Sequence, residues 1–289
     1  MKKTHARRKF KKLLGQANHF LITSLIGLDY IGKTDDIKKP DEFSTSWEPH
    51  NPKISALRSR EYILNSSLAW AVDCLDSYFI MIHRKPKMIL NNDFTVAMSK
   101  AKRSVYLKAV SVGKHFSIDY KIIAMIEILI TWRNNLTHNF AENKISIESI
   151  KVLEENTDYI KENFAGLDIK SVLEKAYNGK SPSFKECASL INATHKFVEY
   201  IDEEILKQLD KYDYARNVYY LYFQEDTEKR ISKLYGKEID FRFNIIENIL
   251  KNYGAFDSVD KDIINKLLSL NINDIRQGLK ENNETSIEE

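Results

Sequence analysis

Residues 119–140 read DYKIIAMIEILITWRNNLTHNF, and this stretch indicates the fold class of the whole chain. Its apolar residues recur with the 3.6-residue period of an α-helix. One stripe of that helix carries Ile122, Ile126, Leu129, Arg133, Leu136 and Phe140. A guanidinium on an otherwise apolar stripe is costly unless an anionic group pairs with it. The stretch therefore predicts a helix with a core or interface face, on which Arg133 serves a purpose other than packing.

The helical period continues on both sides of this stretch. The helix that carries Arg133 is predicted to run from about 117 to 141, and the helix before it to end with Gly113 as its C-cap. That preceding helix covers about 93–113. The other predicted helices cover about 5–28, 54–84, 146–166, 168–177, 183–209, 212–233, 237–253, 258–269 and 272–280. Nine Gly and five Pro in 289 residues are too few for the many tight turns of an all-β fold. The sequence predicts an all-α fold with roughly ten helices.

Changes in composition divide the chain into four predicted segments. Residues 29–53 are not periodic and contain Pro40, Pro49 and Pro52, so residues 1–53 are expected to form an N-terminal helix and loop. The other segments are a helical domain over 54–166, a helical C-terminal extension over 167–280, and a disordered tail over 281–289.

The N-terminal helix is strongly basic. Residues 1–28 have no acidic residue, and their cationic side chains are Lys2, Lys3, Arg7, Arg8, Lys9, Lys11 and Lys12. The net charge of the whole chain is only +3, so the remainder is net negative. A basic arm on an acidic body favours a polyanionic partner such as RNA, while a solvated helix face is the alternative.

The spacing of the cysteines and the hydropathy of the chain indicate in which cellular compartment the protein lies. Cys74 and Cys187 show no CxxC or Cys/His spacing, so reduced thiols are expected in place of a disulfide or zinc site. No segment reaches the roughly 20 apolar residues of a membrane span. The sequence favours a cytoplasmic protein without a membrane association, a metal or a cofactor.

The polar residues around Arg133 form a recognisable pattern. Glu127, Asn134 and His138 fall close together on one edge of the helix, at i, i+7 and i+11, so that Glu127 is a candidate to orient the imidazole. Arg133 and Asn134, followed by three residues and His138 after an apolar helix, resemble the motif of the HEPN superfamily, named for nucleotide binding in higher eukaryotes and prokaryotes. The resemblance covers about residues 54–165 and includes the helical pattern of residues 60–78.

The resemblance implies a HEPN-like helical bundle with metal-independent endoribonuclease activity. His138 would act as general acid and base, Arg133 would clamp the scissile phosphate, and Asn134 would position the phosphate or the imidazole. The products would carry 2′,3′-cyclic phosphate and 5′-hydroxyl ends. Arg133 and His138 lie about 140° apart around a continuous helix. HEPN nucleases pair two motifs across a two-fold axis, so a homodimer with a composite active site is expected.

Several alternatives remain open at this stage. In its size and in its segments outside the HEPN-like domain, the chain resembles phage-defence and abortive-infection HEPN proteins. This resemblance implies RNA, tRNA included, as the substrate and an antitoxin or another regulatory protein as a partner. HEPN toxins controlled by nucleotide transfer carry Tyr two residues after the His, where this chain has Phe140, which argues against that control. The rival functions are a non-catalytic HEPN-like dimer module that binds RNA or nucleotide, and a helical partner-binding scaffold. The tyrosines of residues 212–223 favour core packing over a base-stacking surface, and His195 is expected to be structural.

Overall fold

The computed structural model describes residues 3–34, 37–42, 49–137, 143–224, 226–252, 256 and 259–284. Of residues 281–284 it describes the backbone alone. This part of the chain is all-α, with fourteen helices and no strand, which confirms the predicted fold class. In chain order they are α1 (His5–Lys33), α2 (Pro52–His83), α3 (Asn92–Ala101), α4 (Val105–His115), α5 (Tyr120–Thr137), α6 (Ile147–Glu155), α7 (Thr157–Asn163), α8 (Ile169–Tyr177), α9 (Phe184–Gln208), α10 (Lys211–Gln224), α11 (Thr227–Tyr235), α12 (Ile239–Asn252), α13 (Lys261–Leu268) and α14 (Ile272–Glu284).

The helices form two compact units. One unit contains residues 9–79 and 96–201, and the other contains residues 1–8, 80–95 and 202–289. The units do not follow the predicted segments, because α8 and most of α9 belong to the same unit as the motif helix α5.

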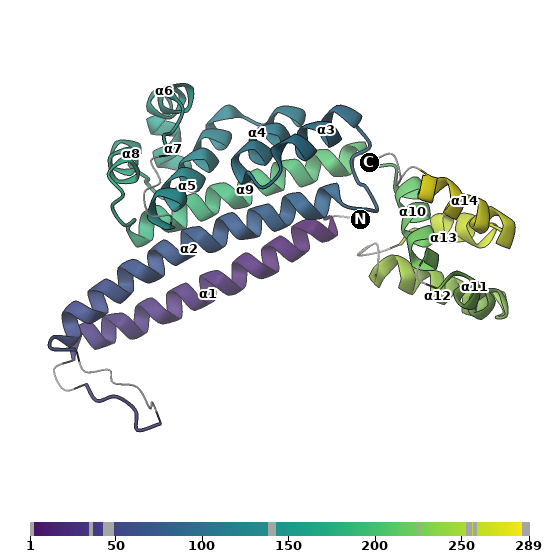
Figure 1. Ribbon diagram of the computed structural model, residues 1–289, viewed down its shortest axis with the longest axis horizontal. Helices are drawn as coiled ribbons and strands as arrows, with labels where there is room; N and C mark the ends of the chain where they lie inside the picture. Colours follow the sequence, from purple (N-terminus) through teal and green to yellow (C-terminus); the bar gives the residue numbers. More distant parts are fainter. Residues whose placement is uncertain are drawn as a thin grey trace. The chain divides into compact units, whose positions relative to one another are not determined.

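The helix α5 forms the centre of the unit of residues 9–79 and 96–201. Every residue from Ile122 to Trp132 is buried, and α4, α6 and α8 all pack against this helix (Figure 1). A helix that is apolar around its whole circumference is stable only when other elements cover it on all sides. The long apolar run quoted above is therefore what makes α5 central.

Two long helices and α9 complete this unit. Figure 1 shows α1 and α2 running antiparallel, side by side. The Phe10 ring of α1 contacts Tyr78 of α2 edge-on, and the Trp70 indole N–H donates to the Leu13 carbonyl at 3.4 Å. On α9, the Phe197 ring packs perpendicular to Phe79 of α2, with centroids 6.2 Å apart. Aromatic contacts of this kind fix the registers of the long helices.

The core of the unit of residues 1–8, 80–95 and 202–289 is rich in tyrosine. Tyr214, Tyr219, Tyr220 and Phe223 of α10 are all buried, which confirms core packing in place of an exposed stacking surface. Tyr222 is half-buried, and the Arg230 guanidinium lies 4.4 Å from its ring centroid. Burial raises the pKa of Tyr214 to about 12, as expected for a phenol held in an apolar environment.

Three predicted helices are each divided into two. The segment 93–113 is interrupted at Lys102, which has a φ of 49°, and Ser104 caps a new helix by accepting from the Leu107 N–H at 3.2 Å. The segments 146–166 and 212–233 divide after Glu155 and Gln224. At the end of the chain α14 continues to Glu284, beyond the predicted start of a tail at 281; residues 285–289 lie outside the described part.

The prediction that Gly113 caps a helix C-terminus is wrong. Gly113 lies inside α4, and the Ile123 side chain of α5 occupies the place of a Cβ, 2.6 Å from its ideal position. The glycine therefore allows α4 and α5 to approach closely. The positive φ that follows the helix belongs to Ser117 instead.

Both cysteines are free and buried, and burial raises the pKa of Cys74 to about 11 and that of Cys187 to about 12. Among the described residues, no helix has both the length and the apolar content that crossing a bilayer requires.

Candidate functional site

The motif residues lie where α5 emerges from the core. Trp132 is fully buried, the four residues from Arg133 to Leu136 are half-buried, and Thr137 is exposed. His138 follows directly and lies outside the described residues, as does Phe140. The sequence RNNLT thus occupies the last turn of a rigid, fully surrounded helix. Rigid elements of this kind hold functional side chains more accurately than loops do.

Arg133 is the most unusual side chain of this turn. Its Nε atom is buried and has no hydrogen-bond partner in the described part of the chain, where its guanidinium also forms no ion pair. Arginine is permanently charged, and a buried cation without a counter-charge is unfavourable. A half-buried guanidinium is the kind of group that binds a carboxylate or a phosphate through two parallel N–H donors. Asn134, the second motif residue, is half-buried beside it.

Asn135 connects the end of α5 to two other segments. Its amide oxygen accepts from the Asn143 backbone N–H at 3.0 Å, and its amide nitrogen donates to the Asn143 carbonyl at 3.1 Å. The same nitrogen reaches the carbonyl of Ala176, in α8, at 3.5 Å. One turn earlier, the Trp132 indole N–H donates to the Lys180 carbonyl at 2.8 Å. The last turn of α5 is thus held by side-chain hydrogen bonds on both sides of Arg133.

Glu127 is buried and contacts the start of α6. Its carboxylate accepts from the Ser146 N–H at 2.7 Å, the Ser146 hydroxyl at 3.0 Å and the Ser149 hydroxyl at 2.5 Å. The N-terminus of a helix has unpaired N–H groups and a partial positive charge, both of which stabilise a carboxylate. The observed partners of Glu127 are therefore the residues that begin α6, and its predicted contact with His138 stays a prediction. Burial, and then the charge of Glu127, raise the pKa of the nearby Tyr106.

Replacing Glu127 by Gln is expected to lower the free energy of unfolding by about 2 kcal/mol, because the amide lacks the charge and one of the acceptors. Urea unfolding followed by circular dichroism measures the change. Glu148→Gln is the matched control, since Glu148 is an exposed carboxylate in the first turn of the same helix. Equal stability of the two variants would contradict a structural role for the Glu127 contacts.

The basic residues of the N-terminal helix have different environments. Lys3, Lys9, Lys11 and Lys12 are exposed and Arg8 is half-buried, while Lys2 lies outside the described residues. Arg7 is only 5% exposed, and its Nη1 lies 3.7 Å from the carboxylate of Asp202, which is also buried. The four exposed lysines remain candidates for RNA binding. Arg7 faces the interior of the protein.

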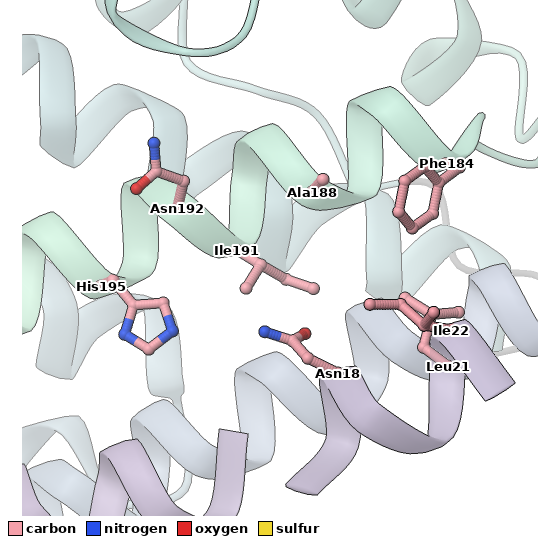
Figure 2. Close-up of a pocket in the computed structure, with 8 residues that line it drawn as sticks. All are labelled: Asn18, Leu21, Ile22, Phe184, Ala188, Ile191, Asn192 and His195. Atoms are coloured by element: carbon pink, nitrogen blue, oxygen red, sulfur yellow. The ribbon is translucent and has the colours of Figure 1, made fainter. Parts of the chain in front are cut away.

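A separate pocket of about 210 Å³ lies between α1 and α9. Its walls include Leu21 and Ile22 of α1 and Phe184 and Ile191 of α9. Figure 2 shows the His195 ring at one end of this pocket, pointing from α9 toward α1. The His195 ring also packs edge-on against Phe10, with centroids 5.4 Å apart, as expected for a structural histidine. No residue of α5 lines the pocket, and within the described ranges no three His, Cys, Asp or Glu side chains form a metal-binding group.

Comparison of the chain with protein-family models finds no match, and comparisons with curated proteins and with solved structures find none either. The HEPN resemblance therefore depends on the residues of the motif and on their surroundings.

Proposed function

We propose that the chain is a metal-independent endoribonuclease of the HEPN type. The observation that supports it most is the position of Arg133: a half-buried guanidinium with no anionic partner in the described part of the chain, in the last turn of the central helix. A cation in this state provides a site for a phosphate group. Its neighbours Asn134 and His138 supply the other residue types that the chemistry needs.

The reaction is an internal transesterification of RNA. His138 removes the proton of the ribose 2′-hydroxyl, the 2′-oxygen attacks the adjacent phosphorus, and the bond from phosphorus to the 5′-oxygen breaks. The leaving oxygen takes a proton from a second imidazole. Arg133 stabilises the negative charge that builds up on the phosphate oxygens, and Asn134 orients the phosphate. The products are a 2′,3′-cyclic phosphate and a 5′-hydroxyl.

The second imidazole comes from another copy of the chain. If the helix of Arg133 continued through His138, the two side chains would diverge by about 140°, so we expect that one copy does not direct both at the same phosphate. An isologous dimer brings two motifs together across a two-fold axis. Ile147 at the start of α6, a helix that packs against α5, is 86% exposed, and we expect its side chain to lie in this interface.

The biological role that fits this activity is that of a phage-defence or toxin effector. Total RNA, with tRNA among the substrates, binds through Lys3, Lys9, Lys11 and Lys12. An antitoxin or regulatory partner restrains cleavage in the host cell, and such an enzyme acts in the cytoplasm.

Incubating the purified protein with total RNA and with tRNA in EDTA tests the proposal. Wild type is expected to give fragments with 2′,3′-cyclic phosphate ends, while Arg133→Ala and His138→Ala leave the RNA intact. RNA that carries 2′-deoxyribose at the cleaved position should resist wild type. If wild type binds RNA without cutting it, both in vitro and in phage-infected cells, the non-catalytic dimer module replaces the nuclease.

A further inference from the structure

We infer that the exposed face of α1 binds a second copy of the chain, with the two α1 helices antiparallel across a two-fold axis. Residues 13–28 of this helix contain no Asp, Glu, Lys or Arg. The solvent side of a surface helix normally carries charged residues, and this helix has none for about four turns. The face lies outside residues 54–165, which carry the HEPN resemblance, so the inference does not depend on the nuclease function.

A stripe of exposed residues runs along this part of α1. Its members recur at alternating intervals of three and four positions, the pattern by which one helix packs along another. The stripe, called the α1 seam below, consists of Lys12, Gly15, His19, Ile22, Ile26 and Asp29, all of them exposed. Ile22 is 48% exposed and Ile26 is 66% exposed. A different side of α1 packs inside the unit, where Leu14, Leu21 and Leu25 are buried.

Gly15 leaves room on the α1 seam for a side chain of another molecule. A Cβ at Gly15 would meet no atom within 4 Å, and the same is true of the other two glycines of α1. At Gly113 of α4, by contrast, the Ile123 side chain occupies the place of a Cβ. Glycine destabilises a helix interior relative to alanine, and a close approach by another group can compensate. No group within the described ranges makes that approach at Gly15.

An antiparallel arrangement makes the apolar part of the α1 seam complementary to itself. We place the two-fold axis midway along residues 13–28. Gly15 then lies opposite Ile26 of the second copy, so that the largest exposed aliphatic side chain of the seam meets its smallest residue. His19 lies opposite Ile22 of the second copy, next to the axis. Each of these contacts occurs twice, as an isologous interface requires.

The charged residues at the two ends of the seam favour a second copy over a membrane surface. In the antiparallel arrangement Lys12 of each copy lies opposite Asp29 of the other, whereas parallel helices would bring like charges together. An anionic bilayer would attract the lysine end and repel Asp29. The Asp29 carboxylate also accepts from Lys33 of its own helix at 2.6 Å, and a carboxylate can accept from a second donor.

The α1 seam is separate from the motif interface proposed above, because none of its residues belongs to α5 or α6. One helix pair of this length is at the small end of specific interfaces, so we expect association in the micromolar range. If the motif dimer also forms, two different isologous interfaces on one chain assemble a tetramer.

Cysteine cross-linking of the full chain tests the register. Lys12→Cys combined with Asp29→Cys is expected to give a covalent dimer on mild oxidation, while neither single variant does. A bond within one chain is too long, since the two positions are about 25 Å apart along the helix (roughly 17 residues at 1.5 Å each). The native Cys74 and Cys187 are buried and do not compete. Cross-linking by Lys12→Cys alone would overturn the antiparallel register, and a double variant that stays monomeric would overturn the interface.

Analytical ultracentrifugation over a concentration series measures the strength of the interface. Ile26→Glu is expected to weaken self-association at least tenfold, because it buries a charge. Val96→Glu on α3 is the matched control, since Val96 is also exposed, at 49%, and should change association less than twofold. Gly15→Leu should weaken association as Ile26→Glu does without lowering the thermal unfolding temperature, because leucine is the better helix former.

Two outcomes would overturn the inference. One is a dissociation constant that neither Ile26→Glu nor Gly15→Leu changes, which would leave self-association to the motif interface alone. The other is a wild type that stays monomeric yet binds vesicles of phosphatidylcholine and phosphatidylglycerol more tightly than Ile26→Glu does. That result would assign the α1 face to a membrane surface.

Discussion

Arg133→Lys is expected to lower the rate of RNA cleavage by about a hundred- to thousandfold, although the positive charge is kept. A guanidinium offers five N–H donors in a planar fork, which matches two phosphate oxygens at once. An ammonium group is a compact charge that binds one oxygen well. The Nε of Arg133 is buried at the point where α5 leaves the core.

Single-turnover cleavage of a labelled RNA in EDTA measures this effect. The loss should appear mainly in the rate of the chemical step, with RNA affinity within about threefold of wild type, because the charge on the phosphate grows in the transition state. Arg58→Lys is the matched control, since Arg58 is exposed on α2. Cleavage by Arg133→Lys at the rate of the Arg58→Lys control would show that a general positive charge is enough, and that Arg133 does not bind the phosphate in the way proposed.

The sequence predicted the helices with long, uninterrupted apolar stripes well. The helix α9 was expected over 183–209 and extends over Phe184–Gln208, and α8 was expected over 168–177 and extends over Ile169–Tyr177. The predictions missed breaks where the apolar pattern continues through an interruption. Ser104 could have revealed the break before α4, because serine is a preferred N-cap residue and its hydroxyl accepts from the N–H of Leu107, three residues further on.

The roles of side chains that act over long sequence distances were not predictable in the same way. On a helical wheel Glu127 faces toward Asn134, whereas its observed partners are Ser146 and Ser149, which belong to the next helix. Periodicity describes one helix and contains nothing about what packs against it. The contacts of Asn135 with Asn143 and Ala176 have the same character.

The environment of Arg7, in contrast, had a signal in the sequence. Arg7 precedes Phe10 by three positions and Leu14 by seven, so it lies on the apolar stripe of its helix, as Arg133 does on α5. The same reasoning that singled out Arg133 therefore applies to Arg7. The difference is that Arg7 has an acidic partner within the chain, and Arg133 has none in its described part.

That partner leads to the largest expected effect on stability. Asp202 is fully buried, accepts from the Thr4 backbone N–H at 3.2 Å and from the Thr4 hydroxyl, and lies 3.7 Å from the Arg7 guanidinium. Asp202→Ala is expected to lower the free energy of unfolding by about 3–5 kcal/mol, because it removes the acceptor of both Thr4 hydrogen bonds and the carboxyl group beside the buried Arg7 guanidinium. Urea unfolding measures this value, with the exposed neighbour Glu203→Ala expected to change it by less than about 0.5 kcal/mol.

The pH dependence of the pair has a definite sign. Burial raises the pKa of Asp202 above its ordinary value of 3.8, although the Thr4 hydrogen bonds and the charge of Arg7 act in the opposite direction. The folded protein therefore retains this proton at a pH where the unfolded chain has lost it, and the contribution of Asp202 to stability falls as pH rises through that interval. Between pH 7 and pH 4, acidification should increase the stability of wild type relative to Asp202→Asn. A constant difference between the two proteins would show that the carboxyl titrates alike in both states.

A double replacement separates the charge of the pair from its volume. Burying two charges has a desolvation cost that their attraction only partly offsets, so an apolar pair of similar size should be tolerated far better than either single change. Arg7→Met combined with Asp202→Leu is expected to recover most of the stability that Asp202→Ala loses. If the double variant is as unstable as Asp202→Ala, the interaction that matters is the pair of Thr4 hydrogen bonds, because those are the contacts that Leu cannot replace. Thr4→Val, which removes only the hydroxyl, would then reproduce much of the loss.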